Sequence, residues 1–423
     1  MKHTCDCGEV VQVILYGFGG PLYYDKGTPE ERQAGFVHTE NSAMPIRKSL
    51  VRLGLSAVLP FGGKIFARRA AELLFSLMGH LRMDEEGRSI EPLSDHWRID
   101  EAQDHKSRPQ YCFDYDWRMD PFEAAAQLND FIEALCKHTG HGKITLIGFS
   151  EGSAVAMAYI KAYGTARLET LILANGAWQG LTFVGELLTR NIRMRGTSAA
   201  HFLASLPSKS RLWRPAMTCL RYTCLLEFLR PLGWCIMKFM GNAIYEQALI
   251  PLFCHMPAFW AFVPQEYYAE ARKLIAGQSK YDKMLEKADK YHYEVQLKAK
   301  NLLRRAQTDG VKIAVICGYG QSSIPLTKAK DYHTDLLIDT ARASGGATVA
   351  RYGKKLPKSD SPYLSQDRSI DASTCLFPDS TWFVKGLKHE DGPIREWMQW
   401  VIYSEKQPTV QEDKKWKQFM SVQ

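Results

Sequence analysis

A serine flanked by two glycines, in Gly148-Phe149-Ser150-Glu151-Gly152, matches the Gly-x-Ser-x-Gly pattern of a nucleophilic serine. Such a hydroxyl attacks a carbonyl carbon when a base takes its proton and N–H donors stabilise the oxyanion that forms. The glycines allow a sharp turn to form, because a side chain at either position would collide with the neighbouring strand or helix. The pentapeptide is short enough to occur by chance, so the flanking residues decide how it is interpreted.

The flanking residues predict a strand before the pentapeptide and a helix after it. Residues 144–147 form a short apolar run with β-branched members, and residues 153–159 are small or apolar, as in a closely packed helix. This context places Ser150 on a nucleophile elbow, with the backbone N–H of Glu151 beside it as an oxyanion donor. We therefore interpret Ser150 as a nucleophile.

A serine on such an elbow needs a histidine base and a carboxylate that orients the base, in the chain order serine, acid, histidine. Of the twelve histidines, His389 directly follows a late strand-like segment, 381–386, where the last part of a sheet would deliver the base. Aspartates at four positions precede that segment, and each also suits a turn-capping role: Asp360, Asp367, Asp371 and Asp379.

The alternation of strand-like and helical segments along the chain predicts an α/β-hydrolase fold, with a mainly parallel sheet and helices on both faces. Strand-like runs at 11–17, 111–118, 143–150 and 168–176 alternate with helical patterns. The clearest helix, 120–140, opens on an aspartate followed by proline and ends at a glycine.

We expect the core to comprise residues 8–180 and 300–403, with a partly helical insertion at about 35–108. Residues 181–299 are expected to form a large helical cap inserted after the central strands, and 404–423 a polar C-terminal extension. The division follows from where the strand-like runs stop and helical or polar patterns take over.

Much of the net charge of +8 lies in the predicted cap, because residues 181–250 hold nine Lys or Arg and three Glu among many large apolar residues. This pattern fits a cap packed on its own core, and also peripheral contact with an anionic membrane. Charges interrupt it too often for a bilayer span. No nucleic-acid recognition motif accompanies the basic residues, so nucleic acid is not expected as a partner.

Cofactors and metals are not expected. Of ten cysteines only Cys5 and Cys7 lie close together, and no pair of CxxC motifs is present, so the pattern does not predict a zinc site. The glycines at 17–20 lack the third glycine of a dinucleotide fingerprint. The first residues lack the pattern of a secretory signal, so free thiols and a cytoplasmic, membrane-peripheral location are the expectation.

Several motifs follow one another in the order found in a known family. They are VILYGFGG (13–20), YDWR (115–118), GFSEG, LANGAWQG (173–180), HMPAFWAFVP (255–264) and VICGYGQSSIP (315–325). Together they resemble the lecithin:cholesterol acyltransferase family, which includes lysosomal phospholipase A2. The resemblance spans nearly the whole chain, and YDWR and the pentapeptide are its most specific parts.

The resemblance implies a serine enzyme of the lipase, phospholipase or acyltransferase type that acts on lipid or other carboxylic esters through an acyl-enzyme. The family's catalytic aspartate lies in a Gly-Asp-Gly-Thr-Val turn, and the nearest counterpart here is 366–370, so the resemblance assigns the acid to Asp367. The preceding glycine is missing, which leaves Asp371 and Asp360 open. The sequence does not choose between hydrolysis and acyl transfer.

Further residues are expected around this serine. The turn after the first strand would supply the second oxyanion donor from Phe18, with Gly17 and Gly19 letting the backbone approach the substrate. Trp117 and Trp178 suit either the lining of an acyl pocket or ordinary core packing.

Two residues depart from the family pattern, Phe149 where the family has histidine and Glu151 where an apolar residue is usual. With the missing glycine before Asp367, they support an alternative function. In this alternative the chain is a catalytically inactive module that binds lipid or a protein partner through the basic cap.

Overall fold

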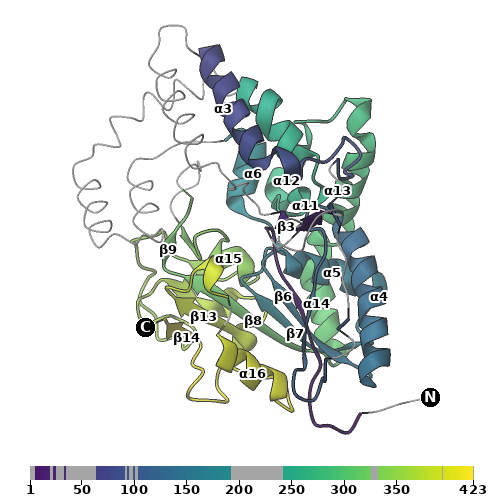
Figure 1. Ribbon diagram of the computed structural model, residues 1–423. Helices are drawn as coiled ribbons and strands as arrows, with labels where there is room; N and C mark the ends of the chain where they lie inside the picture. Colours follow the sequence, from purple (N-terminus) through teal and green to yellow (C-terminus); the bar gives the residue numbers. More distant parts are fainter. Residues whose placement is uncertain are drawn as a thin grey trace, which may run out of the picture.

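A computed structural model describes most of the chain. The described residues are 5–19, 22–24, 33–34, 63–90, 93–94, 99–100, 103–191, 242–324, 332–392 and 394–422. Within them the protein has an α/β fold built on one seven-stranded sheet (Figure 1). The strand order is β14-β13-β8-β7-β6-β1-β5, and every neighbouring pair is parallel, so the predicted parallel sheet is confirmed.

Most strands of this sheet overlap the strand-like runs of the sequence, but β14 lies in the segment that was expected to be a polar extension. Their bounds are β1 Gln12–Leu15, β5 Gln110–Phe113, β6 Ile144–Phe149, β7 Leu168–Ala174, β8 Lys312–Tyr319, β13 Thr381–Lys385 and β14 Phe419–Ser421. The central strands β6, β7 and β8 are almost continuously buried, as expected when both faces of a parallel sheet are covered.

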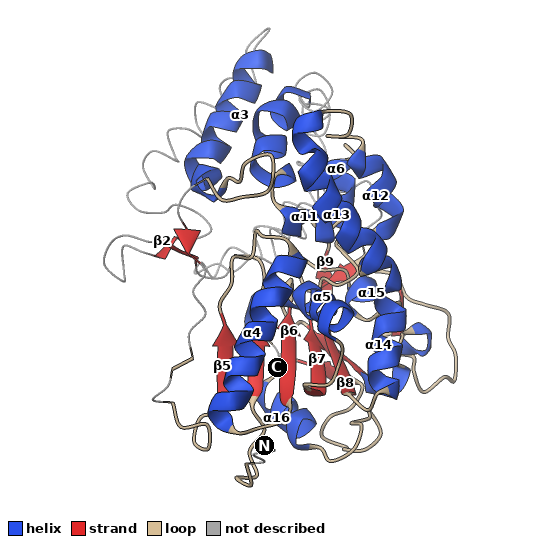
Figure 2. Ribbon diagram, turned by 90° about the vertical axis from the view of Figure 1, so that its right-hand side faces the viewer, coloured by secondary structure: helices blue, strands red, loops and turns tan. Residues whose placement is uncertain are grey.

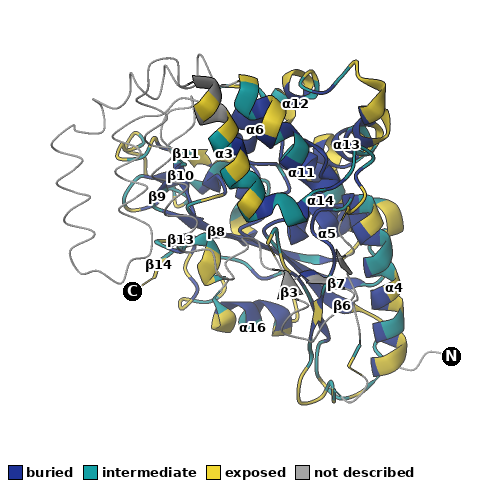
Figure 3. Cartoon of the chain, turned by 45° about the horizontal axis from the view of Figure 1, so that its top comes forward, coloured by how far each residue is buried: buried dark blue, intermediate teal, exposed yellow. Residues whose placement is uncertain are grey.

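Successive residues of the strands point to two separate apolar cores, because side chains alternate between the faces of a sheet. On β7, Leu171 and Leu173 pack with helices α4 (Pro121–Thr139), α5 (Gly152–Tyr163) and α14 (Ala299–Thr308), whereas Ile172 packs with α16 (Arg395–Tyr403). Figure 3 shows the central strands mostly dark blue, while yellow, exposed residues lie on the outer face of α4. Helices therefore cover both faces.

Helix α4 begins and ends where its capping residues predict. The Asp120 side chain accepts a hydrogen bond from the Phe122 N–H at the first turn. Gly140 ends the helix with φ 73°, a left-handed conformation that glycine adopts without strain.

A layer of helices lies above the carboxyl ends of the strands (Figure 2). It comprises α6 Thr182–Leu188, the π-helical segment η2 Tyr245–Cys254, α11 Pro257–Ala261, α12 Gln265–Arg272 and α13 Asp282–Glu294, with α3 Gly63–Met78 packed against η2. Eight of the nine basic residues counted in the predicted cap fall between 192 and 241, outside the described residues. The expected membrane-facing surface of the cap therefore lies outside the described residues as well.

Shorter elements complete the described residues. They are β2 Leu22–Tyr24, β3 Gln33–Ala34, η1 Gly79–Leu81, β4 Leu93–Ser94, η3 Ser279–Tyr281, η4 Gln296–Lys298, β9 Gln321–Ser322, β10 His333–Thr334, α15 Thr340–Ala343, β11 Thr348–Val349, β12 Ile370–Asp371, η5 Ala372–Thr374, η6 Pro378–Ser380 and η7 His389–Asp391. Among the elements that the structure describes, no helix has both the length and the apolar character needed to cross a bilayer.

The C-terminal residues correct one expectation. Instead of a polar extension, residues 404–422 complete the sheet: β14 pairs with β13, and the buried Trp416 carbonyl accepts a hydrogen bond from the Trp382 indole. Because the segment is rich in charged residues, its composition gives no indication of the short strand or of the buried Trp416.

The YDWR segment ties the early insertion to the core. The Arg118 side chain is fully buried; its Nε and Nη2 donate to the two oxygens of Asp116, at 2.9 and 2.6 Å. Nη1 and Nη2 also donate to the Leu81 carbonyl and the Ser89 hydroxyl. A buried ion pair of this kind is costly to break, because the remaining charge keeps its desolvation penalty without its partner.

Replacing Arg118 therefore tests the packing of this region. We expect Arg118→Met to destabilise the protein by roughly 3–5 kcal/mol, because it leaves the buried Asp116 carboxylate without its ion-pair partner. The matched control is Arg167→Met, which breaks a half-exposed pair with Glu133 and should cost about 1 kcal/mol or less. Urea unfolding gives the free energy of unfolding of both variants. Equal destabilisation would contradict the inference that the buried Arg118–Asp116 pair matters more to the fold than the half-exposed pair.

Candidate active site

Ser150 lies on a tight turn between β6 and α5, as the flanking residues predict. Its φ of 54° is left-handed, a conformation that is strained for a residue with a side chain. Hydrogen bonds hold the turn: the Ser150 N–H donates to the Ala174 carbonyl, and the Ser150 carbonyl accepts from the N–H groups of Ser153 and Ala177. Strained backbone held in this way is typical of functional sites.

The two glycines of the pentapeptide are required by close packing. A Cβ on Gly148 would lie 2.8 Å from the Ser153 Cα, and one on Gly152 would lie 2.3 Å from the Leu15 carbonyl oxygen on β1. Both contacts are far shorter than van der Waals distance and involve backbone, which cannot move aside cheaply. The turn can therefore form only with glycine on both sides.

His389 completes a hydrogen-bonded chain with Ser150 and an aspartate. Its Nε2 lies 3.0 Å from the Ser150 Oγ, and its Nδ1 lies 2.8 Å from the Asp335 Oδ2. A carboxylate can only accept, so the Nδ1–H donates to Asp335 and Nε2 is left to accept the serine proton. The side chain of Asp335 is 1% exposed.

The backbone fixes both partners of this chain. The other oxygen of Asp335 accepts hydrogen bonds from the Leu337 and Ile338 N–H groups, at 3.0 and 2.7 Å. The His389 N–H donates to the Asp335 carbonyl at 2.8 Å. The carboxylate and the imidazole thus have little freedom to separate.

The assignment of the acid to Asp367 is corrected by this geometry. The Asp367 carboxylate pairs with Lys385 at 2.7 Å and accepts from the Ser365 hydroxyl and the Ser369 N–H, so it caps a turn. Burial acts to raise its pKa, but the hydrogen bonds from Lys385, Ser365 and Ser369 together lower the pKa to about 2.

The two alternatives for the acid are corrected in the same way. The Asp371 side chain caps η5 by accepting from the Ser373 N–H, and Asp360 is exposed on a loop. The residue that sequence reasoning missed, Asp335, lies in the segment after β8. β8 is the immediate sheet neighbour of β13, the strand that precedes His389.

The loop after β1 lies directly against the serine. A Cβ on Gly17 would lie 2.4 Å from the Ser150 Cβ, 2.7 Å from its Oγ and 3.0 Å from the Glu151 nitrogen. This space would therefore be closed by any side chain at position 17. Gly17, Phe18 and Gly19 line a cleft of about 330 Å³ together with Ser150 and His389. The roles of the Phe18 and Glu151 N–H groups as oxyanion donors stay predictions.

Ser150 also lines a second, apolar cavity of about 560 Å³. Its walls are almost wholly aliphatic and aromatic: Phe18, Ala177, Leu181, Phe183, Val184, Leu187, Ile244, Tyr245, Leu249, Phe253, Phe259, Phe262 and Leu337. Two hollows of about 640 and 610 Å³ lie elsewhere, but charged residues such as Lys385 and Arg272 line them and neither contains Ser150. The serine thus joins a small open cleft to an apolar chamber.

Of the two roles left open for Trp117 and Trp178, the structure shows packing in the core for both. Trp117 lies behind Phe18, with ring centroids 4.2 Å apart, and Trp178 donates its indole N–H to the Ala343 carbonyl. Neither lines the apolar cavity, whose walls come mainly from α6, η2 and α11. The apolar residues of these helices have the pattern of ordinary cap packing, so the sequence alone does not single them out as cavity walls.

The two departures from the family pattern both find a place beside the serine. The Phe149 ring stacks on the His389 ring, with centroids 5.1 Å apart. The Glu151 side chain points into the core and is 1% exposed, and its Oε2 has no hydrogen-bond partner among the described residues. Burial, followed by the nearby Asp116 carboxylate, raises the pKa of Glu151 well above its usual range, which favours a neutral carboxyl next to the nucleophile.

Comparisons with known proteins leave the site to be argued from its geometry. No protein-family model and no curated protein matches the sequence. Among solved structures, a chain of "The crystal structure of Tle4-Tli4 complex" is similar at 11% identity, with a TM-score of 0.26, over 73% of this chain and 75% of that chain. A similarity this weak carries no argument about fold or function.

The buried Glu151 makes a testable prediction about pH. Its pKa is raised in the folded state above the ordinary value of 4.5. Its contribution to stability is therefore fully present below that pH and is lost as the pH rises toward the folded pKa. Glu151→Gln cannot lose a proton, so it does not show this loss. The thermal midpoint of Glu151→Gln minus that of wild type should therefore increase steadily from about pH 5 to about pH 8.

The control for this comparison is Glu390→Gln, which removes the same charge from an exposed position near the site. Its midpoint should follow that of wild type over the same range. A difference between Glu151→Gln and wild type that does not change with pH would contradict the account.

Proposed function

We propose that the protein is a serine hydrolase of the α/β-hydrolase fold that cleaves lipid or other carboxylic esters through an acyl-enzyme. The observation that carries the proposal is the continuous hydrogen-bonded chain from the Ser150 Oγ through His389 to Asp335. A nucleophile, a base and an orienting carboxylate in contact are what acyl transfer by serine requires.

The positions of the three residues in the fold support this proposal. Ser150 follows β6 and His389 follows β13, both parallel strands of the main sheet, and Asp335 lies in the segment after β8, directly after β10. Their chain order is serine, aspartate, histidine, the order of α/β-hydrolases. The left-handed serine on a strand-to-helix turn between two glycines is the expected elbow.

The geometry supports a specific sequence of proton transfers. His389 Nε2 takes the proton of Ser150 as the Oγ attacks the ester carbonyl, and Asp335 stabilises the resulting imidazolium. The N–H groups of Glu151 and Phe18 are the proposed oxyanion donors, each contributing on the order of 3 kcal/mol to the transition state. His389 then gives the proton to the leaving alkoxide, and an activated water releases the acid from Ser150.

The two cavities at the serine favour an ester with one long apolar arm. The apolar cavity of about 560 Å³ lies within the range of ligand sites, and its walls are suited to an acyl chain. The smaller cleft, which holds His389 and Glu390, would take the alcohol part of the ester. The leaving oxygen would then lie on the side of the imidazole that must protonate it.

The central experiment is labelling with a fluorophosphonate probe and turnover of p-nitrophenyl esters. Ser150→Ala should lose both the labelling and the ester turnover. Asp335→Asn should lower kcat by roughly 10³- to 10⁴-fold, because the imidazole is no longer held as the Nδ1–H tautomer. The matched control is Asp367→Asn, which should keep kcat within a few-fold of wild type. If Asp367→Asn loses activity and Asp335→Asn keeps it, the assignment of the acid is wrong.

The same experiment separates the enzyme from the alternative, an inactive module that binds lipid or protein. Wild-type protein that neither reacts with the probe nor turns over any ester would support that alternative. The side chains that first favoured it, Phe149 and Glu151, contact the base or the core and leave the hydrogen-bonded chain intact.

Opposite substitutions at one wall position test the acyl site. Val184 on α6 lines the apolar cavity, so Val184→Phe should shorten the space and Val184→Ala should enlarge it. We expect Val184→Phe to lower kcat/KM for a ten-carbon ester relative to a four-carbon ester by roughly tenfold or more, and Val184→Ala to change the ratio the opposite way or leave it. Parallel changes for both chain lengths would show that the acyl chain binds elsewhere.

A further inference from the structure

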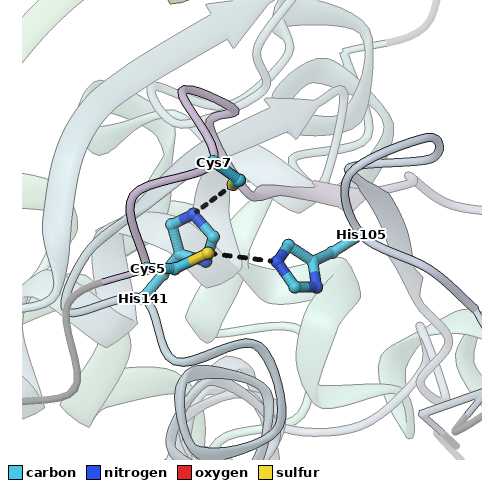
Figure 4. A group of neighbouring side chains, drawn as sticks. All are labelled: Cys5, Cys7, His105 and His141. Carbon is cyan, nitrogen blue, oxygen red and sulfur yellow. Dashed lines mark hydrogen bonds between the residues drawn. The ribbon is translucent and has the colours of Figure 1, made fainter.

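Four side chains with metal-binding atoms meet at the edge of the sheet opposite the serine. They are Cys5, Cys7, His105 and His141, and Figure 4 shows the two thiols and two imidazoles gathered around one point. One sulfur or nitrogen atom from each lies within 4.8 Å of those of the others, and all four residues are partly buried. No other such group occurs among the residues that the structure describes.

One contact in the cluster has the length expected between two ligands of a tetrahedral zinc ion. Zinc binds thiolate sulfur at about 2.3 Å and imidazole nitrogen at about 2.0 Å, which places neighbouring sulfur and nitrogen ligands about 3.5 Å apart. The Cys5 Sγ lies 3.4 Å from the His105 Nε2. The two imidazole rings are nearly perpendicular, at 86°.

The His141 ring has a nitrogen that needs a partner. Its Nδ1 is buried and has no hydrogen-bond partner among the described residues, while its Nε2 lies 3.2 Å from the Glu9 carbonyl oxygen. A metal on Nδ1 would satisfy this atom and leave the Nε2–H to donate to Glu9. Metal-bound histidines commonly make such a second hydrogen bond to a carbonyl.

We propose that Cys5, Cys7, His105 and His141 bind one zinc ion. Two thiolates balance its charge, and two neutral imidazoles complete a closed four-ligand shell, which is the composition of structural zinc sites. The expectation of no metal rested on the absence of paired CxxC motifs. The ligands instead come from three segments that are far apart in the sequence, so their spacing gives no motif.

The proposed ion would join three neighbouring strands at their amino ends. Cys5 and Cys7 precede β1, His105 precedes β5, and His141 precedes β6, and these strands lie in the order β5-β1-β6. The Cys5 N–H already donates to the Gly140 carbonyl, beside His141. Zinc would therefore fix the start of β1, the strand that ends just before Gly17 beside Ser150. Its role would be to stabilise the fold and not to take part in the reaction.

Metal content and thermal stability of the full-length protein test this proposal. Protein produced in zinc-supplemented medium should carry one zinc per chain by elemental mass spectrometry. Removal with 1,10-phenanthroline should lower the thermal midpoint by at least about 5 °C, and added zinc should restore it. Zinc below about 0.1 per chain together with a midpoint that ignores the chelator would overturn the proposal.

Variants locate the ion. Cys5→Ser combined with Cys7→Ser, and separately His105→Asn, should lose the zinc. The matched controls Cys112→Ser and His138→Asn change an exposed cysteine and an exposed histidine and should keep one zinc per chain. Full zinc retention by the first two variants would overturn the assignment.

If those variants fail to fold, cobalt in wild-type protein gives a second readout. Exchange of zinc for Co²⁺ should produce the strong visible bands of tetrahedral coordination and a thiolate charge-transfer band in the near ultraviolet. Weak octahedral bands without charge transfer, or a disulfide between Cys5 and Cys7 in the freshly purified protein, would contradict a Cys2His2 site.

Discussion

The hydrogen bond between Asp335 and His389 is the interaction on which the proposed chemistry depends. Asp335 holds the imidazole by its side chain at Nδ1 and by its carbonyl at the His389 N–H, while two backbone N–H groups hold Asp335. An imidazole fixed at one nitrogen presents the other to Ser150. The sheet order makes this contact available, because β8 lies directly beside β13 and both end at the same edge.

Close backbone approach is the second constraint, and it explains why glycines lie at positions 17, 148 and 152 around the serine. Ser150 turns in a left-handed conformation against the loop after β1, at a distance that leaves no space for a Cβ on Gly17. The neighbouring residues supply the packing that the glycines cannot make: Phe18 packs on Trp117 and Phe149 packs on His389. The core thus supports a tight polar turn from both sides.

Features with a local signal were predictable from the sequence, and features formed by distant segments were not. Most strands, the helix capped by Asp120, the elbow and the place of His389 follow from neighbouring residues. Asp335 and Asp367 both lie in polar turns, and only the path of the chain after β8 decides which reaches the imidazole. The same holds for His105 and His141, which meet the two early cysteines only in the folded sheet, and for Trp416, whose burial a charged segment conceals.

Nuclear magnetic resonance of the imidazole N–H tests the central claim most directly, because it observes the hydrogen bond and needs no substrate. In protein labelled with ¹⁵N-histidine, the account predicts a downfield Nδ1–H signal of His389 that is protected from exchange and is lost or strongly shifted in Asp335→Asn. The signal should be unchanged in Asp367→Asn. A signal that survives in Asp335→Asn and disappears in Asp367→Asn would contradict the account.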